Sequence, residues 1–127
     1  IENPLCVPVP LHWTRLFMRT YNQAALLTRE IARLKGWIYA PFLLTRKRRT
    51  PSQGYLSKKE RIKNVDRAFS IPEAKRIQVS GKTILLVDDV FTTGATLNAC
   101  SKTLLRAGAK GVHIVTLGRV VKAQQLG

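Results

Sequence analysis

The sequence predicts an α/β protein with a mainly parallel, twisted sheet flanked by helices. Residues 84–87 form a continuous apolar run, which is typical of a buried parallel strand. A helical pattern follows at 95–107, and another apolar stretch follows at 112–117. A strand, a helix and a strand at this spacing indicate a βαβ unit, whose two strands are parallel. The length of 127 residues fits one domain, and 45% apolar residues suffice for a buried core.

The remaining elements follow from local patterns along the chain. A short strand or the end of a strand is predicted at 7–11, where two prolines argue against a central position in a sheet. Residues 22–35 predict a helix that stops at Gly36, and residues 42–45 predict a second strand. Residues 50–65 lack apolar periodicity, so we expect them to leave the core, with a short helix from the capping box at 57–60. A short strand is expected at 69–71.

Each long helix is predicted to bury one face. The apolar positions recur at helical spacing in both segments. In the first helix they are Ala24, Leu27, Ile31 and Leu34, and in the second they are Leu97, Cys100, Leu104 and Ala107, with Gly108 after the C-cap.

Composition restricts the function. The 22 Lys and Arg against 7 Asp and Glu give a net charge of +15, so we expect an anionic partner. Cys6 and Cys100 lack the spacing of a metal site and are predicted to be free or buried thiols. Because no membrane span or signal peptide is visible, we expect a soluble cytoplasmic protein without a membrane partner. The chain starts at Ile1, which predicts that an N-terminal piece is missing.

Residues 87–96, Val-Asp-Asp-Val-Phe-Thr-Thr-Gly-Ala-Thr, join the apolar strand to the helix after it. In open α/β sheets the ligand lies at the carboxyl ends of the strands, where this segment falls. Threonine hydroxyls, a glycine that permits close approach and the N–H groups of a first helical turn predict a phosphate site there.

The acidic pair Asp88 and Asp89 suggests the rest of the ligand. Ionised carboxylates only accept hydrogen bonds, so they suit a vicinal diol or a hydrated divalent cation. A diol beside a phosphate describes a ribose 5-phosphate. The alternative is that Asp89 only caps the helix while Asp88 lies in a turn. A P-loop enzyme and a receiver domain are excluded, because the chain has no GxxxxGK[ST] motif and no acid after Asp89.

With these residues, the chain resembles type I phosphoribosyltransferases, which use phosphoribosyl pyrophosphate (PRPP). More narrowly it resembles the ComF family, also called the competence-protein F or amidophosphoribosyltransferase-like family. The matching segments beyond 87–96 keep the family's order and cover nearly the whole chain: 8–12, 21–24, 50–53, 56–57 and 61–65.

The resemblance implies a type I phosphoribosyltransferase fold with a flexible catalytic loop at 50–65. Asp88 and Asp89 would hold the ribose hydroxyls and, with Arg61 of the loop, form the catalytic set. The 5-phosphate would be bound by Thr92, Thr93, Gly94, Ala95 and Thr96. The pyrophosphate would be bound by Arg15 and Arg19 after the first strand and by Lys58 and Lys59 of the loop. The alternative for these bases is an ordinary solvated surface.

The resemblance also implies partners. Mg²⁺ would arrive on PRPP, because the chain has no dedicated metal cluster. The reaction would release pyrophosphate and use an unidentified nitrogen acceptor, in nucleotide metabolism. Purine-salvage relatives carry an acid where this chain has Thr92, which makes a purine acceptor less favoured. Longer relatives carry a zinc ribbon ahead of this segment, and a homodimer is one option.

Two rival functions remain open. One is a non-catalytic PRPP-binding regulatory module. The other is a nucleic-acid-binding protein in DNA uptake, which fits the net charge although no known nucleic-acid-binding motif is visible.

Overall fold

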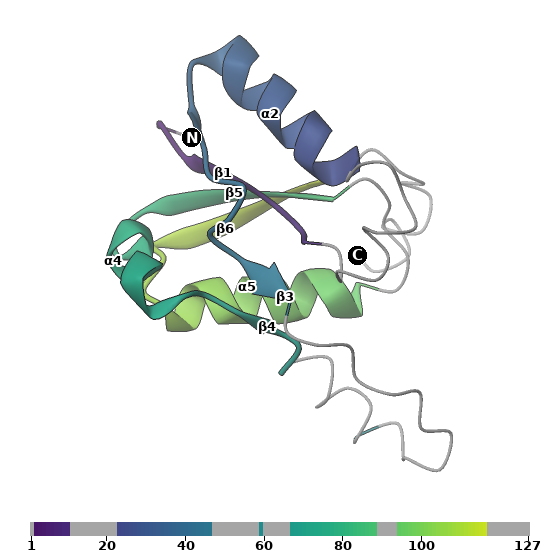
Figure 1. The fold of residues 1–127 in the computed structure, drawn as a ribbon, viewed down its shortest axis with the longest axis vertical. Helices are drawn as coiled ribbons and strands as arrows, with labels where there is room; N and C mark the ends of the chain where they lie inside the picture. The colour runs from purple at the N-terminus through teal and green to yellow at the C-terminus, as the bar shows by residue number, and fades with distance from the viewer. Residues whose placement is uncertain (1, 11–22, 47–58, 60–66, 89–93, 117–127) are drawn as a thin grey trace.

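The computed structural model describes residues 2–10, 23–46, 59, 67–88 and 94–116 (Figure 1). Within them, β1 (Leu5–Pro8), β2 (Ile38–Tyr39), β5 (Thr83–Asp88) and β6 (Gly111–Thr116) form a parallel sheet in the order β2-β1-β5-β6. Helix α2 (Gln23–Lys35) lies on one face of this sheet and α5 (Ala95–Arg106) on the other (Figure 1). This arrangement confirms the predicted α/β class and the βαβ unit.

Smaller elements connect the layers. Strands β3 (Thr45–Arg46) and β4 (Phe69–Ser70) form an antiparallel pair, and β4 packs against α5. A 3₁₀ turn η1 (Glu73–Lys75) and a short helix α4 (Arg76–Val79) lead into β5. None of the described helices is long and apolar enough to cross a membrane.

The central strands bury both faces, as their continuous apolar sequence predicts. On one face, Ile84 and Leu86 of β5 share the main core with Leu97, Cys100 and Leu104 of α5. On the other face, Leu85 and Val87 pack with Cys6 of β1 and Ala32 of α2, beside the half-buried Leu27 and Ile31. Successive residues of β5 therefore pack against different helices, because side chains alternate between the two faces along a strand.

Both cysteines are free and buried, as predicted. Burial raises the pKa of both the Cys6 and the Cys100 thiol. Each sulfur is therefore held in its protonated form and acts as a small apolar group of the core rather than as a nucleophile.

The prediction for the first strand was wrong about its place in the sheet. β1 lies in the middle, between β2 and β5, although Pro8 is its last residue. The N–H of Val9 donates to the carbonyl of Val87 over 2.8 Å, so the nitrogen of the preceding residue, Pro8, faces β2 instead. The pairing with β2 has already ended at Tyr39, and a missing N–H at Pro8 therefore breaks no ladder hydrogen bond.

The strand predicted at 42–45 is also corrected. Phe42 lies in a turn with 71% of its surface exposed, while Leu43 and Leu44 are buried in a bend and β3 begins only at Thr45. The sheet strand of this region is β2, four residues earlier in the chain. It was missed because two residues are too short to show a period in the sequence.

The first helix buries its predicted face only in part: Ala24 is buried, and Leu27 and Ile31 are half-buried against the core as predicted. Its fully buried residues are Ala24, Thr28 and Ala32, and the hydroxyl of Thr28 donates to the carbonyl of Ala24 over 2.5 Å. Leu34, which was expected in the core, is 69% exposed. Small side chains line the contact because they let the helix approach the sheet closely. The second helix buries Leu97, Cys100 and Leu104 as predicted.

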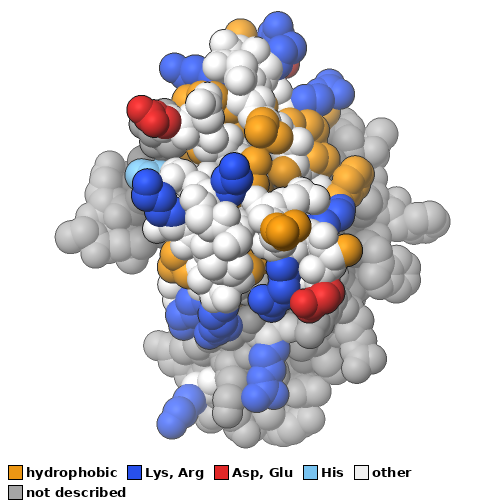
Figure 2. All heavy atoms as spheres, turned by 90° about the vertical axis from the view of Figure 1, so that its left-hand side faces the viewer, with side chains coloured by type: hydrophobic (Ala, Val, Ile, Leu, Met, Phe, Trp, Pro, Cys, Tyr) orange, Lys and Arg blue, Asp and Glu red, His pale blue; other side chains and the backbone are white. Residues whose placement is uncertain are grey.

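Exposed apolar side chains gather at the end of the molecule where the strands begin. Figure 2 shows this face, with hydrophobic side chains over the end of α2 and the region of β2, and many more basic than acidic groups around them. The large apolar residues that are more than half exposed are Leu34, Ile38 and Phe42 in and after these segments and Ile77 in α4. This face is opposite the carboxyl ends of the strands, where the candidate site lies.

Candidate functional site

The carboxyl ends of β1 and β5 meet at one edge of the sheet. Figure 1 shows both strands ending on its right-hand side, where α2 and α5 begin. The bond from Val9 to the carbonyl of Val87 keeps the two strand ends level. Asp88 is the last residue of β5, is half-buried and pairs with Thr116 of β6. A carboxylate is thus placed at the strand end where α/β proteins bind their ligands.

The start of α5 forms the second part of the site. Gly94 occupies the N-cap position with φ 86° and ψ −13°, a left-handed conformation that glycine adopts without strain. Its carbonyl accepts the N–H of Asn98 over 2.9 Å, which begins the helical ladder. The N-cap residue makes no side-chain hydrogen bond to the first turn, because glycine has no side chain. The start of a helix carries a positive dipole end, which favours an anionic ligand there.

Electrostatics link the strand end to two other elements. Burial is the main cause of the raised pKa of Cys100, and the charge of Asp88 raises it further. The charge of Arg46 acts in the opposite direction and lowers it. A carboxylate from β5 and a guanidinium from β3 are therefore both within electrostatic reach of one sulfur on the second turn of α5.

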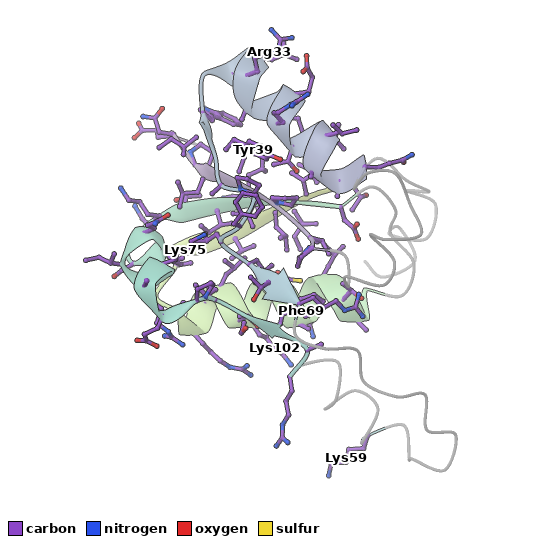
Figure 3. The ribbon with its side chains drawn as sticks, viewed as in Figure 1. Arg33, Tyr39, Lys59, Phe69, Lys75 and Lys102 are labelled. Atoms are coloured by element: carbon purple, nitrogen blue, oxygen red, sulfur yellow. The ribbon has the colours of Figure 1, made fainter. Side chains whose placement is uncertain are left out.

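The predicted site residues divide into three groups. Asp88, Gly94, Ala95 and Thr96 lie at the strand end and the helix start, as predicted. Lys59 is exposed, and Figure 3 shows it far from the end of β5, so the structure does not bring it to this site. The others lie outside the described residues and stay predictions: Arg15, Arg19, Lys58, Arg61, Asp89, Thr92 and Thr93.

Sequence reasoning missed Arg46 as a neighbour of the site. Residues 46–49 are Arg-Lys-Arg-Arg, so no local feature singles out Arg46 among these bases. Its position depends on the antiparallel pairing of β3 with β4, which places Arg46 directly opposite Phe69. That pairing joins residues more than twenty positions apart, and no local pattern indicates it.

The described residues provide no built-in metal centre. Among them, no three His, Cys, Asp or Glu side chains lie close enough to hold a metal ion. Among the described residues, Asp88 offers a carboxylate at the strand end, and Mg²⁺ prefers oxygen ligands from one or two carboxylates together with substrate phosphates. This carboxylate fits an Mg²⁺ ion that is held mainly by a phosphorylated ligand.

The family model of the phosphoribosyl transferase domain matches residues 24–124. The chain therefore belongs to this family. A parallel sheet with a carboxylate and the start of a helix at its carboxyl edge fits this assignment.

Curated relatives include proteins named for competence and for DNA utilization. The chain is 39% identical over 116 residues to competence protein F of Haemophilus influenzae. The match covers 89% of this chain and 49% of that protein. It is 35% identical to DNA utilization protein YhgH of Escherichia coli K12, over 91% of this chain and 49% of the relative. The chain thus spans about half the length of the curated relatives it matches.

Solved structures support the same fold. The glutamine PRPP amidotransferase from B. subtilis, solved with ADP and GMP, is 25% identical with a TM-score of 0.60, over 92% of this chain and 23% of that one. An asparagine mutant of a hypoxanthine phosphoribosyltransferase, from a study of an invariant aspartic acid, is 16% identical with a TM-score of 0.53. The match covers 91% of this chain and 51% of that one. The fold is that of the type I phosphoribosyltransferases.

Proposed function

We propose that this domain binds Mg-PRPP at the carboxyl edge of the sheet and transfers its phosphoribosyl group to a nitrogen nucleophile. The observation that carries the proposal is the placement of Asp88 at the end of β5, facing the same edge as the Gly94-initiated start of α5. A hydrogen-bond acceptor and an anion site at one edge match the diol and the 5-phosphate of one ribose phosphate.

Each part of the site has a defined task in this reaction. Asp88, with Asp89 beside it in sequence, accepts hydrogen bonds from the ribose hydroxyls and fixes the sugar. The backbone at 92–96 binds the 5-phosphate. The bond between C1 and the pyrophosphate oxygen breaks with its electron pair leaving on pyrophosphate. A C1–N bond forms from the lone pair of the acceptor, whose N–H proton passes to solvent.

The charges of the site act on the sugar and on the leaving group. Carboxylates near the ribose stabilise the positive character that develops as the C1–O bond loosens. Arg15, Arg19, Lys58 and Arg61 are the basic residues proposed to receive the pyrophosphate. When bound, Mg²⁺ carried by PRPP supplies neutralisation of the pyrophosphate charge.

The test is binding of Mg-PRPP measured by calorimetry for the wild type and for Asp88→Asn. We expect the isosteric amide to weaken binding by about tenfold or more, because a charge-assisted hydrogen bond to the diol is lost. Glu73→Gln is the matched control, since Glu73 is exposed on η1, and its affinity should equal that of the wild type. Equal affinity for Asp88→Asn and the wild type would refute this role of the acidic pair.

Binding and catalysis are separated by a turnover assay. Mg-PRPP is offered with ammonia and with small primary amines, and released pyrophosphate is measured. Release that depends on the amine supports transfer. Tight PRPP binding without release for any acceptor would instead leave a PRPP-binding regulatory module.

A second candidate function is binding of DNA. The curated relatives named competence protein F and DNA utilization protein YhgH favour it, together with the net charge of +15. Its test is the salt dependence of DNA binding, because this binding depends on the charge of the whole molecule.

A further inference from the structure

Three basic side chains of the described structure lie over aromatic rings, namely Lys35, Arg46 and Lys75. Of these, Arg46 is the one whose ring, that of Phe69, is buried. The β3–β4 pair places it directly opposite Phe69, and the hydroxyl of Thr45 donates to the carbonyl of Ser70 over 3.1 Å, which stabilises this register. The guanidinium carbon of Arg46 lies 5.2 Å from the centroid of the Phe69 ring, within the range of a cation–π contact.

The ring beneath Arg46 belongs to the main core. Phe69 is only 4% exposed and shares its cluster with Leu97 and Cys100 on the first turns of α5. Figure 3 shows Phe69 beside the half of α5 that begins at the candidate site. The guanidinium of Arg46 is therefore attached to a rigid surface rather than carried on a freely moving side chain.

The charge of Arg46 reaches the same region as that of Asp88. Both act on the pKa of the Cys100 thiol, in opposite directions. The sulfur lies on the second turn of α5, so both charges act on the half of the helix that begins at Gly94. Arg46 reaches this half through Phe69, because β4 packs against α5.

We propose that Arg46 is a phosphate-binding residue of this site, an inference that rests on the proposed binding of PRPP. A guanidinium is a planar fork of N–H donors that matches phosphate oxygens bidentately. Packing on Phe69 also restricts the side chain before the ligand arrives, which reduces the entropy lost on binding. Lysine lacks the planar fork and does not reproduce both properties.

The test compares Arg46→Met, Arg46→Lys and the wild type in calorimetric titrations with Mg-PRPP, ribose 5-phosphate and pyrophosphate. Methionine keeps an apolar cover over Phe69 but removes the charge, and we expect a loss of about tenfold in PRPP affinity with an unchanged melting temperature. The PRPP affinity of Arg46→Lys should lie between those of Arg46→Met and the wild type. Arg106→Met is the control, because Arg106 is exposed at the far end of α5, and it should bind like the wild type.

The three ligands identify the phosphate that Arg46 contacts. A loss shared by PRPP and ribose 5-phosphate assigns it to the 5-phosphate, and a loss shared by PRPP and pyrophosphate assigns it to the leaving group; either supports the proposal. Wild-type affinity in Arg46→Met overturns it while PRPP binding by the domain stands. If the wild type binds no PRPP, the proposed function fails, and this inference fails with it. Should Arg46→Met not fold, Arg46→Lys decides: weaker binding at wild-type stability supports the role, and unchanged affinity overturns it.

Discussion

Gly94 connects backbone geometry to ligand binding at the level of single residues. It holds a left-handed conformation at the N-cap of α5, directly beside the segment that the phosphate site requires. A side chain at this position would be strained, because Cβ approaches the carbonyl oxygen when φ is positive. The same conformation occurs at Gly36, after the end of α2, where a Cβ would meet no atom within 4 Å.

Gly94→Ala should therefore reduce both stability and affinity. We expect a loss of about 1–2 kcal/mol in the free energy of unfolding, measured with denaturant, and weaker binding of PRPP as the first turn moves. Gly36→Ala provides the comparison, since it carries similar backbone strain far from the site. It should lose a similar amount of stability and keep its affinity. A Gly94→Ala variant that binds PRPP as tightly as Gly36→Ala would contradict the assigned role of this helix start.

Arg46 and Asp88 show how much of the site can be predicted from residue types alone. The acidic pair stood out because acids are scarce in this chain, and its chemistry followed from position after an apolar strand. Nothing local distinguishes Arg46 from the other bases near it. Only the cross-strand partner Phe69 and the proximity of Cys100 give it a place in the site.

At the level of elements, α2 shows why an apolar pattern does not determine which face is buried. Hydrophobic spacing predicted Leu34 in the core, yet the helix contacts the sheet through Ala24, Thr28 and Ala32. The sheet surface beneath α2 already carries Leu85 and Val87. Small residues on the helix let these side chains fill the interface, so the larger Leu27 and Ile31 lie at its margin.

Ala32→Leu tests this close contact. The larger side chain must displace Cys6, Leu85 or Val87, and we expect a loss of about 1–3 kcal/mol in the free energy of unfolding. Leu34→Ala, only two residues further along the same helix, should change it by less than about 0.5 kcal/mol because Leu34 is exposed. Chemical denaturation of both variants measures the difference. A larger loss of stability for Leu34→Ala than for Ala32→Leu would mean that α2 presents another face to the sheet.

At the level of the whole molecule, the net charge of +15 bears on the second candidate function. Many basic side chains remain on the face opposite the site (Figure 2), where they cannot serve a single PRPP molecule. A surface of this kind attracts polyanions without recognising their sequence.

Titration with a fluorescent oligothymidine at several salt concentrations tests this attraction. If the domain binds single-stranded DNA, the logarithm of the affinity should fall linearly with the logarithm of salt, by about 0.7 for each phosphate contacted. An oligomer of the same bases on an uncharged backbone should not bind. Equal binding of the charged and uncharged oligomers, or no binding at low salt, would remove DNA as a partner. Competition by PRPP would show that DNA occupies the ribose-phosphate site.

The sequence by itself determined the α/β class, the βαβ unit and the resemblance to phosphoribosyl transferases that residues 87–96 carry. These features depend on continuous local patterns: an apolar strand, an amphipathic helix and the residues that join them. The tertiary structure decided what depends on distant partners. It placed β1 in the middle of the sheet despite Pro8, turned α2 onto its small residues, and brought Arg46 over Phe69 beside the start of α5. Such contacts join side chains that the chain keeps far apart, and only packing makes them neighbours.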